Sequence, residues 1–257
     1  MDQQNSLRQR IEDGGVAFGA SADSFAPTLV ELYGELGLDF VWLDFEHHGP
    51  SPWDSHTMEN LARAAELSGT ELFVRIPDSD PALIRKVLDA GVRNVLVPRV
   101  DSAAEVRRCV EAARYEYDGT PGERGNSTAR TNTWRTADRY LETEDDEVCL
   151  GVMIEKTTAV EELGSILSVP ELGFAFIGPS DLSVQMGRSK SDPELQRRIS
   201  DVRDACLDAG VPIGCIESDP DDAARAVEEG YQIVRIASDY GAVGAMVRDR
   251  LDRLRAD

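Results

Sequence analysis

Short apolar runs alternate along the chain with longer segments in which apolar residues recur every three or four positions. The short runs are rich in β-branched residues and predict strands, whereas the longer segments predict amphipathic helices. We predict strands at Val16–Ser21, Phe40–Glu46, Glu71–Ile76, Asn94–Val100, Cys149–Glu155, Phe174–Pro179, Pro212–Glu217 and Ile233–Ser238. We predict helices at about Pro27–Leu36, Met58–Ser68, Pro81–Ala90, Ser102–Arg114, Thr157–Leu167, Pro193–Ala209, Pro220–Glu229 and Tyr240–Arg255.

The order of these elements favours one closed (β/α)8 barrel over residues 1–257. A strand followed by a helix is the unit of a parallel sheet, and a barrel of eight such units needs roughly 250 residues. The alternative is an open, doubly wound sheet, but no G-x-G-x-x-G motif follows the first predicted strand. One irregular stretch, Tyr115–Glu147, is long enough to suggest a functional or mobile loop.

The composition is that of a soluble protein, which we expect to be cytoplasmic. No run approaches the roughly 18 apolar residues of a membrane span, and the start, MDQQNSLRQR, lacks the apolar stretch of a secretory signal. The four cysteines, Cys109, Cys149, Cys206 and Cys215, form no C-x-x-C pair, so we expect buried free thiols.

The chain has a large excess of acidic residues. Asp and Glu number 48 against 27 Lys and Arg, which gives a formal charge of −21. Such a surface repels polyanions and disfavours nucleic-acid binding. A site for a cationic partner is one interpretation of the acids. Because they are spread along the chain, a solvated coat suited to a halophilic cytoplasm is the favoured one.

Polar residues stand where four of the predicted strands end. In a (β/α)8 barrel these ends form the mouth that holds the active site. The residues are Asp44, His47 and His48 at the end of the second strand, Arg75 at the end of the third, Glu155 at the end of the fifth, and Gly178–Asp181 at the end of the sixth. Each has a structural alternative, such as a helix cap for Glu155 or Asp181, or an ordinary ion pair for Arg75.

A pair of carboxylates with no cysteine or histidine cluster suits a hard divalent ion. Mg²⁺ or Mn²⁺ takes oxygen ligands and keeps open positions for water or substrate oxygens. Zn²⁺ fits less well, because structural zinc prefers Cys and His and the chain has three histidines.

The segments at these strand ends resemble the HpcH/HpaI family of metal-dependent 2-oxo acid aldolases, such as the 4-hydroxy-2-oxoheptanedioate and 2-dehydro-3-deoxyglucarate aldolases. The matching pieces are FVWLDFEHHGPS, FVRIPDSDPALIRKVLDAGVRNVLVPRVDSAAEV and GVMIEKTTAVEELGSILSVPELGFAFIGPSDLSVQMG. They run in order from about Phe40 to Gly187. The resemblance implies a TIM barrel of the phosphoenolpyruvate/pyruvate-binding type, which cleaves a 4-hydroxy-2-oxo acid reversibly to pyruvate and an aldehyde.

The resemblance also implies roles for individual residues. Glu155 and Asp181 would bind the metal, which is Mg²⁺, Mn²⁺ or Co²⁺ in such enzymes, and Arg75 would contact the 2-oxo acid. His47 would be the catalytic base, with His48 as its rival. The remaining implied site residues are Asp89 as the partner of His47, Asp44 as a further acid, and Gly178, Pro179, Ser180 and Asp181 around the substrate carboxylate.

The family's barrels are hexamers, built from dimers that exchange the eighth helix, which implies an exchanged helix at about residues 240–255. Three differences from the family's pattern leave the identity of the aldehyde product open. Met153 stands where many members carry Gln, His48-Gly49 replaces a short Ala-Pro segment, and the spacing around Arg124-Gly125 is altered.

Three competing functions remain. A Schiff-base aldolase needs a lysine inside the barrel, and Lys156 is the candidate, although strand alternation turns it away from the face of Glu155. A citrate-lyase-like or malyl-CoA-like lyase would use similar acids. The third is a catalytically silent barrel that binds a small acid.

Overall fold

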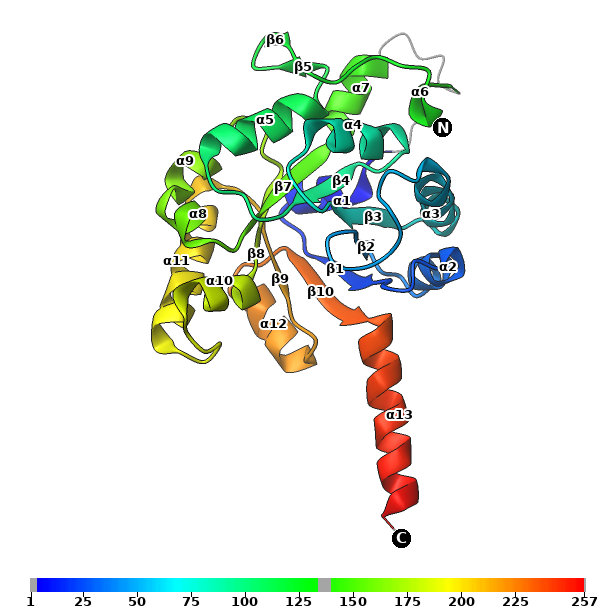
Figure 1. The fold of residues 1–257 in the computed structure, drawn as a ribbon, viewed down its shortest axis with the longest axis vertical. Helices are drawn as coiled ribbons and strands as arrows, with labels where there is room; N and C mark the ends of the chain where they lie inside the picture. The colour runs from blue at the N-terminus through cyan, green and yellow to red at the C-terminus, as the bar shows by residue number, and fades with distance from the viewer. Residues whose placement is uncertain (1–3, 134–139, 257) are drawn as a thin grey trace.

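Eight parallel strands close into a barrel in the computed structural model, which describes residues 4–133 and 140–256 (Figure 1). Their order around the barrel is β1-β10-β9-β8-β7-β4-β3-β2. They are β1 (Ala17–Ser21), β2 (Phe40–Asp44), β3 (Glu71–Arg75), β4 (Asn94–Val97), β7 (Cys149–Ile154), β8 (Phe174–Ile177), β9 (Ile213–Ile216) and β10 (Ile233–Ser238). The predicted (β/α)8 barrel is confirmed, and several strands end one to three residues earlier than expected.

The helices that cover the barrel lie close to their predicted positions. They are α2 (Pro27–Glu35), α3 (Ser55–Ser68), α4 (Pro81–Asp89), α5 (Ala103–Ala113), α11 (Pro193–Ala209), α12 (Pro220–Glu228) and α13 (Asp239–Arg255). The helix predicted at Thr157–Leu167 is instead two short helices, α8 (Thr157–Glu161) and α9 (Leu163–Leu167). Helix α3 begins three residues early, because the Asp54 side chain accepts a hydrogen bond from the backbone N–H of His56 and caps it.

Further elements lie outside the predicted pattern. The irregular stretch contains a small hairpin, β5 (Glu116–Tyr117) with β6 (Thr120–Pro121), and the helices α6 (Arg130–Thr133) and α7 (Tyr140–Glu147). Helix α1 (Ser6–Glu12) buries Leu7 and Ile11 in the same cluster as Phe40 of the barrel interior. Helix α10 (Pro179–Met186) follows β8 after Gly178 alone, so the segment Gly178–Asp181 at the end of the sixth predicted strand is the start of a helix with proline in its first turn.

The barrel interior is filled by aromatic rings that face glycines on a neighbouring strand. A Cβ on any of three glycines would lie 2.3 Å from a phenylalanine ring, so only glycine fits there. The pairs are Gly19 with Phe40, Gly151 with Phe174, and Gly214 with Phe176. Trp42 stacks on Phe73 at 4.9 Å between ring centroids. This packed layer confines the polar groups above it to the mouth.

Helix α13 extends away from the barrel (Figure 1). Asp239, at its start, is its one buried residue, and six large apolar side chains along the helix are exposed. They are Tyr240, Val243, Met246, Val247, Leu251 and Leu254.

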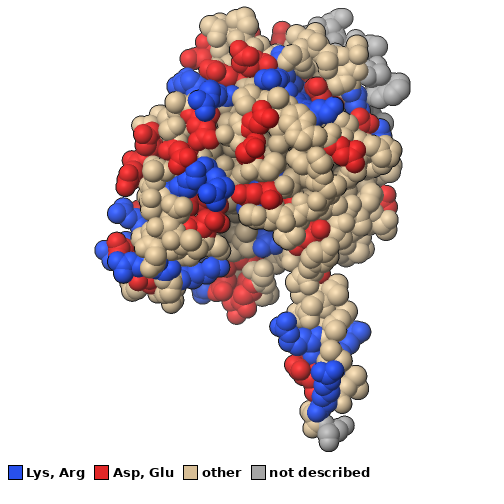
Figure 2. Space-filling view, in the orientation of Figure 1, with Lys and Arg blue, Asp and Glu red and all other residues tan. Residues whose placement is uncertain are grey.

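All four cysteines are buried free thiols, as predicted. No helix within residues 4–133 and 140–256 combines the length and the apolar character needed to cross a lipid bilayer. Acidic and basic side chains are intermixed over the face seen in Figure 2, so the surplus of acid is not gathered in one patch there.

Candidate active site

Four charged side chains point from the strand ends into the barrel mouth. Each stands two residues after a side chain of the interior cluster, and alternate residues of a strand share one face. The pairs are Trp42 and Asp44 on β2, Phe73 and Arg75 on β3, Met153 and Glu155 at the end of β7, and Ile233 and Arg235 on β10. The strand period therefore brings these residues together, as it does in other barrels of this kind.

Arg75 and Asp44 form a forked pair. The Arg75 Nε lies 2.9 Å from Asp44 Oδ1 and Nη2 lies 2.6 Å from Oδ2. Burial alone would raise the pKa of Asp44, but the hydrogen bonds and charge of Arg75 outweigh it and hold that pKa below its usual range. The guanidinium also lies over the Trp42 ring, 5.6 Å from its centroid. Asp44 is thus ionised and Arg75 is fixed in orientation.

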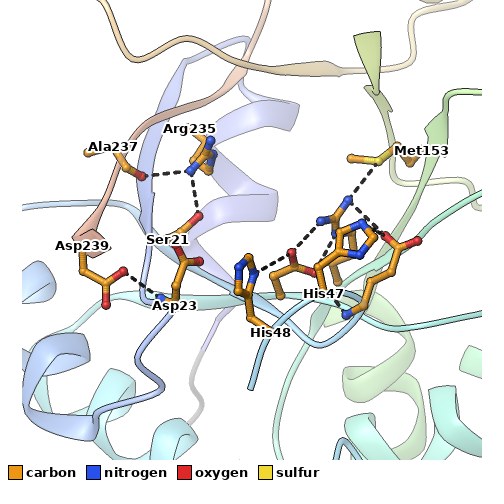
Figure 3. A network of polar contacts seen from close by, with 11 residues as sticks. Ser21, Asp23, His47, His48, Met153, Arg235, Ala237 and Asp239 are labelled. Carbon is orange, nitrogen blue, oxygen red and sulfur yellow. Dashed lines mark hydrogen bonds and ion pairs between the residues drawn. The ribbon is translucent and has the colours of Figure 1, made fainter. Parts of the chain in front are cut away.

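The third nitrogen of Arg75 faces two further groups. Its Nη1 is 3.1 Å from Glu46 Oε2 and donates to the Met153 sulfur at 3.6 Å. Met153 therefore contacts the arginine at the pocket floor (Figure 3). Burial raises the pKa of Glu46 in spite of the Arg75 charge, and its Oε2 is buried without a hydrogen bond from the described residues.

Glu155 is the most enclosed carboxylate of the mouth. It is 2% exposed, and one oxygen accepts the backbone N–H of Arg99 at 2.7 Å. Arg99 adopts a left-handed backbone conformation, with φ of 55°, at the position from which it makes this bond. Burial raises the pKa of Glu155 to about 7, and the charges of Glu46 and Asp181 add to that rise.

Asp181 lies in the first turn of α10. Its carboxylate is about half exposed and 3.8 Å from Arg99 Nη1. Gly178, just before this helix, has space for no side chain, because a Cβ there would lie 2.6 Å from Glu155 Oε2. The glycine therefore allows the start of α10, with Pro179 and Ser180, to approach Glu155 closely.

The carboxylates Glu46, Glu155 and Asp181 fit a divalent cation. Among residues 4–133 and 140–256, no three acidic, histidine or cysteine side chains already form a metal cage. The charges of Asp181 and Glu46 nevertheless act on Glu155, and Glu46 keeps one buried oxygen without a hydrogen bond. A buried group of like charges is costly unless a cation offsets it. The oxygen donors are those that Mg²⁺ or Mn²⁺ prefers.

Each histidine at the mouth has a carboxylate beside it. His47 Nε2 is 3.5 Å from Glu46 Oε2, and His48 Nδ1 is 3.3 Å from Asp44 Oδ2 (Figure 3). Both side chains are about half exposed. The carboxylate beside His47 is therefore Glu46, a residue absent from the sequence-based prediction.

The expected partner of His47, Asp89, lies elsewhere in the chain. It is the last residue of α4, where it bonds to Ser127 and is under the influence of the Arg124 and Lys86 charges. Within one chain the structure therefore does not bring Asp89 to His47. Asp89 ends a helix that leads away from the third strand, whereas His47 follows the second strand directly.

Lys156 points out of the barrel interior, as strand alternation predicts. Its Nζ is 2.6 Å from Asp101 Oδ2, and Thr158 donates to the other oxygen of the same carboxylate at 2.6 Å. The lysine is thus engaged on the outer side of the strand, away from the face that Glu155 occupies. This placement disfavours the Schiff-base mechanism.

Two residues of the mouth, Glu46 and Arg235, are not among those predicted from the sequence. The alternation of inward and outward positions along a strand could have indicated both residues. Glu46 stands two residues after Asp44, and Arg235 interrupts the apolar run Ile233–Ile236 at an inward position. Charged residues at such positions face the interior and need a partner or a ligand.

Comparison with known proteins shows the family and the fold of the chain. The sequence profile of the family described as HpcH/HpaI aldolase/citrate lyase matches residues 19–244. A hydroxypyruvate/pyruvate aldolase of Pseudomonas aeruginosa is 31% identical over 98% of this chain and 93% of its own. A 2-dehydro-3,6-dideoxy-6-sulfogluconate aldolase of Pseudomonas putida is 31% identical over 90% of both chains. The crystal structure of a family protein from Burkholderia cenocepacia J2315 superposes with a TM-score of 0.90 at 27% identity, covering 98% of this chain and 100% of that one.

Proposed function

This chain belongs to the HpcH/HpaI aldolase/citrate lyase family, and on that premise we propose that it uses a divalent metal ion to cleave a 4-hydroxy-2-oxo acid. It is a carbon–carbon lyase of the 2-oxo acid aldolase type, as its aldolase relatives over nearly the whole chain indicate. The products of the proposed cleavage are pyruvate and an aldehyde, and the reaction is reversible.

One observation supports this proposal more than any other. Three carboxylates, Glu46, Glu155 and Asp181, act on one another at the mouth beside the fixed guanidinium of Arg75. An arginine recognises a carboxylate or an oxyanion, and a group of acids recognises a cation. A 2-oxo acid bound with a metal ion presents both features to such a site.

Glu155 and Asp181 are the residues that would hold the metal, which we propose to be Mg²⁺ or Mn²⁺. When bound, the ion supplies positive charge that favours a 2-oxo acid and the enolate derived from it. The amino end of α10, at Gly178, Pro179, Ser180 and Asp181, is suited to the substrate carboxylate through the backbone N–H groups of Ser180 and Asp181. Pro179 has no N–H, and that of Gly178 donates to the Ile154 carbonyl.

Arg75 and a histidine perform the remaining steps. As the bond between carbons 3 and 4 breaks, negative charge develops on the 2-oxo oxygen, and Arg75 Nη1 is the donor that Asp44 leaves available for it. His47 takes the proton of the 4-hydroxyl group, so that the aldehyde leaves as a neutral molecule. A proton then returns to carbon 3 to give pyruvate. Glu46 orients His47.

A metal-removal experiment tests the mechanism. We expect EDTA to abolish pyruvate release and Mn²⁺ or Mg²⁺ to restore it, while borohydride with pyruvate traps no adduct. Glu155→Gln and Asp181→Asn each replace a charged ligand with an amide and are expected to weaken metal affinity severely. Lys156→Ala is the matched control outside the interior. Full activity in EDTA, with loss on removing Lys156, would overturn the mechanism.

We also propose a cellular location and an oligomeric state for the enzyme. We place it in the cytoplasm, where four free cysteines stay reduced. Its exposed apolar stripe on α13 suits a neighbouring copy, and we propose a homo-hexamer in which this helix is exchanged between subunits. The formal charge of −21 suits a halophilic cytoplasm.

A further inference from the structure

Arg235 is a second arginine in the barrel mouth. It follows Ile233 by two positions on β10, so it shares the interior face of that strand. Its Nη1 donates to Ser21 Oγ at 3.0 Å and to the Ala237 carbonyl at 3.4 Å (Figure 3). Both acceptors are uncharged, and both belong to the neighbouring interior positions of β1 and β10.

The charge of Arg235 is not neutralised by a contact. Its Nε is buried and bonds to no atom of the described residues, and none of their carboxylates lies within 4.0 Å of the guanidinium nitrogens. Arg75, by contrast, has Asp44 at 2.6 Å. Burial lowers the pKa of Arg235, which is the cost of enclosing a cation without a paired anion.

The nearest acids do not form an ion pair with Arg235 within 4.0 Å. Asp239 accepts the backbone N–H groups of Asp23 and Ser24, each at 3.0 Å. Burial and then the charge of Asp239 raise the pKa of Asp23. Asp23 and Asp44 therefore act on Arg235 only at a distance. Its Nη1 is bonded to Ser21 and Ala237, and its Nη2, which has no hydrogen-bond partner among the described residues, is the nitrogen left to bind an anion.

Arg235 lies across the mouth from the groups that would bind the 2-oxo acid. Strand β10 is three strands from β3 in one direction and three strands from β7 in the other. Arg75 stands on β3, and Glu155 follows β7. In Figure 3 Arg235 and Ser21 lie at one side of the network and Met153 at the other, with His48 between them.

We propose that Arg235 binds an anionic group at the far end of the aldehyde half of the substrate. This inference rests on the proposed function and adds the substrate class, an aldehyde that carries a terminal carboxylate or sulfonate. An unpaired, partly buried guanidinium recognises an anion through charge-assisted hydrogen bonds, which are about twice as strong as those to a neutral hydroxyl group. Because β10 is three strands away from both β3 and β7, we expect methylene groups to separate this anion from the aldehyde carbon.

Matched aldehydes test the proposal. With pyruvate and Mn²⁺, we would measure kcat/KM for succinic semialdehyde, for 3-sulfopropanal and for butanal, which has the same carbon chain without the charge. The ratio of either anionic aldehyde to butanal is expected to exceed ten in the wild type and to fall about 10- to 100-fold in Arg235→Gln. Comparison of succinic semialdehyde with 3-sulfopropanal shows whether a carboxylate or a sulfonate is preferred.

Two further variants serve as controls. Arg235→Lys retains the charge without the fork, so its ratio is expected to lie between those of the wild type and Arg235→Gln. If Arg235→Gln does not fold, Arg235→Lys alone tests whether Arg235 binds the anion. Arg225→Gln on the exposed face of α12 removes the same charge outside the mouth. An unchanged ratio in both Arg235 variants, or an equal fall in Arg225→Gln, would overturn the proposal.

Failure of the proposed function has a separate signature. Wild-type enzyme that forms the enolate of pyruvate exchanges the methyl protons for deuterium in D2O without any aldehyde. If this exchange occurs and the aldehyde ratio does not depend on Arg235, the function stands and the role of Arg235 is wrong. If no exchange occurs with Mn²⁺ present, the proposed function itself is wrong.

Discussion

Arg75 binds Asp44 through two parallel hydrogen bonds, from Nε to Oδ1 at 2.9 Å and from Nη2 to Oδ2 at 2.6 Å. The two residues are direct neighbours in the register of β2 and β3, so the sheet itself sets their separation. Nη1 is the one guanidinium nitrogen that Asp44 does not bind, and it faces Glu46 and Met153. Asp44 thus serves as a positioning residue that aims one donor of Arg75 into the mouth.

The two parallel hydrogen bonds between Arg75 and Asp44 predict that lysine cannot replace Arg75. Arg75→Lys keeps the charge but loses the planar grip on Asp44, and we expect kcat/KM for pyruvate release to fall about 10²- to 10³-fold. Arg203→Lys is the matched control, because Arg203 also contacts two carboxylates, Asp204 and Glu229, but on the outer surface. Equal kinetics of Arg75→Lys and wild type would contradict the assigned role.

The barrel could be predicted from the sequence because its elements have strong local patterns. The run Cys149–Ile154 is apolar throughout, and the helix Pro193–Ala209 begins at an aspartate-proline pair and ends before a glycine. Helix α1 has no such pattern. Its Leu7 and Ile11 become apolar anchors only when the barrel end exists to receive them.

Site residues that stand at the end of a strand could be predicted from the sequence. Contacts that depend on the distance between two side chains could not. Arg75 and Glu155 meet at the mouth because strand alternation requires it. Two features follow from side-chain positions that no spacing encodes. They are the closeness of His47 to Glu46 and the lack, among the residues the structure describes, of an acid within 4.0 Å of Arg235. The expected pairing of Asp89 with His47 came from resemblance, and one chain does not form it.

The two histidines predict different effects on turnover. We expect His47→Ala to lower kcat by about 10²- to 10⁴-fold while metal affinity stays unchanged, because a general base is lost. His48→Ala removes only a 3.3 Å contact with Asp44, which Arg75 still binds, and is expected to cost much less. Single-turnover kinetics and a Mn²⁺ titration of both variants separate these effects. A larger loss in His48→Ala would reassign the base.

The raised pKa of Glu155 predicts how the metal-free protein responds to pH. The folded pKa is about 7 and the ordinary value is 4.5, so between these values the folded state binds more protons than the unfolded state. The contribution of Glu155 to the free energy of unfolding is therefore present below about pH 4.5 and lost as pH rises through 7. In EDTA we expect the melting temperature of wild type, relative to Glu155→Gln, to fall across this window.

Metal binding provides the second half of that test. The ion needs the ionised carboxylate, so Mn²⁺ at pH 8 is expected to raise the melting temperature of the wild type and not that of Glu155→Gln. Glu71→Gln is the control, because Glu71 is a partly buried carboxylate whose pKa is raised and which accepts hydrogen bonds from Ser6. A Mn²⁺ response that survives in Glu155→Gln would exclude Glu155 as a ligand.

The exposed stripe on α13 predicts a stable oligomer. Val243, Val247 and Leu251 recur at helical spacing on a helix that extends from the barrel. We expect light scattering at high salt to give six times the 28.2 kDa of one chain. Val247→Asp is expected to reduce the assembly to smaller species, whereas Asp252→Ala, on the opposite face, is not. A 28.2 kDa monomer for the wild type would refute the assembly.

The charge of −21 predicts a strong dependence of stability on salt. Like charges on a folded chain repel one another, and the screening length shortens from about 30 Å at 0.01 M salt to about 3 Å at 1 M. Repulsion between acids spread over the surface therefore weakens greatly across this range. We expect the melting temperature to rise steeply with molar KCl.

Sucrose at equal osmolality separates screening from a general stabilising effect of solutes, because it is excluded from protein surfaces but carries no charge. If repulsion limits stability, KCl raises the melting temperature well beyond what sucrose does, and most of the gain comes at the low end of the salt range, where screening changes most per mole. A melting temperature that is flat in KCl, or that rises equally in sucrose, would show that the acidic surface costs the fold little. The halophilic interpretation of the charge would then have no physical support.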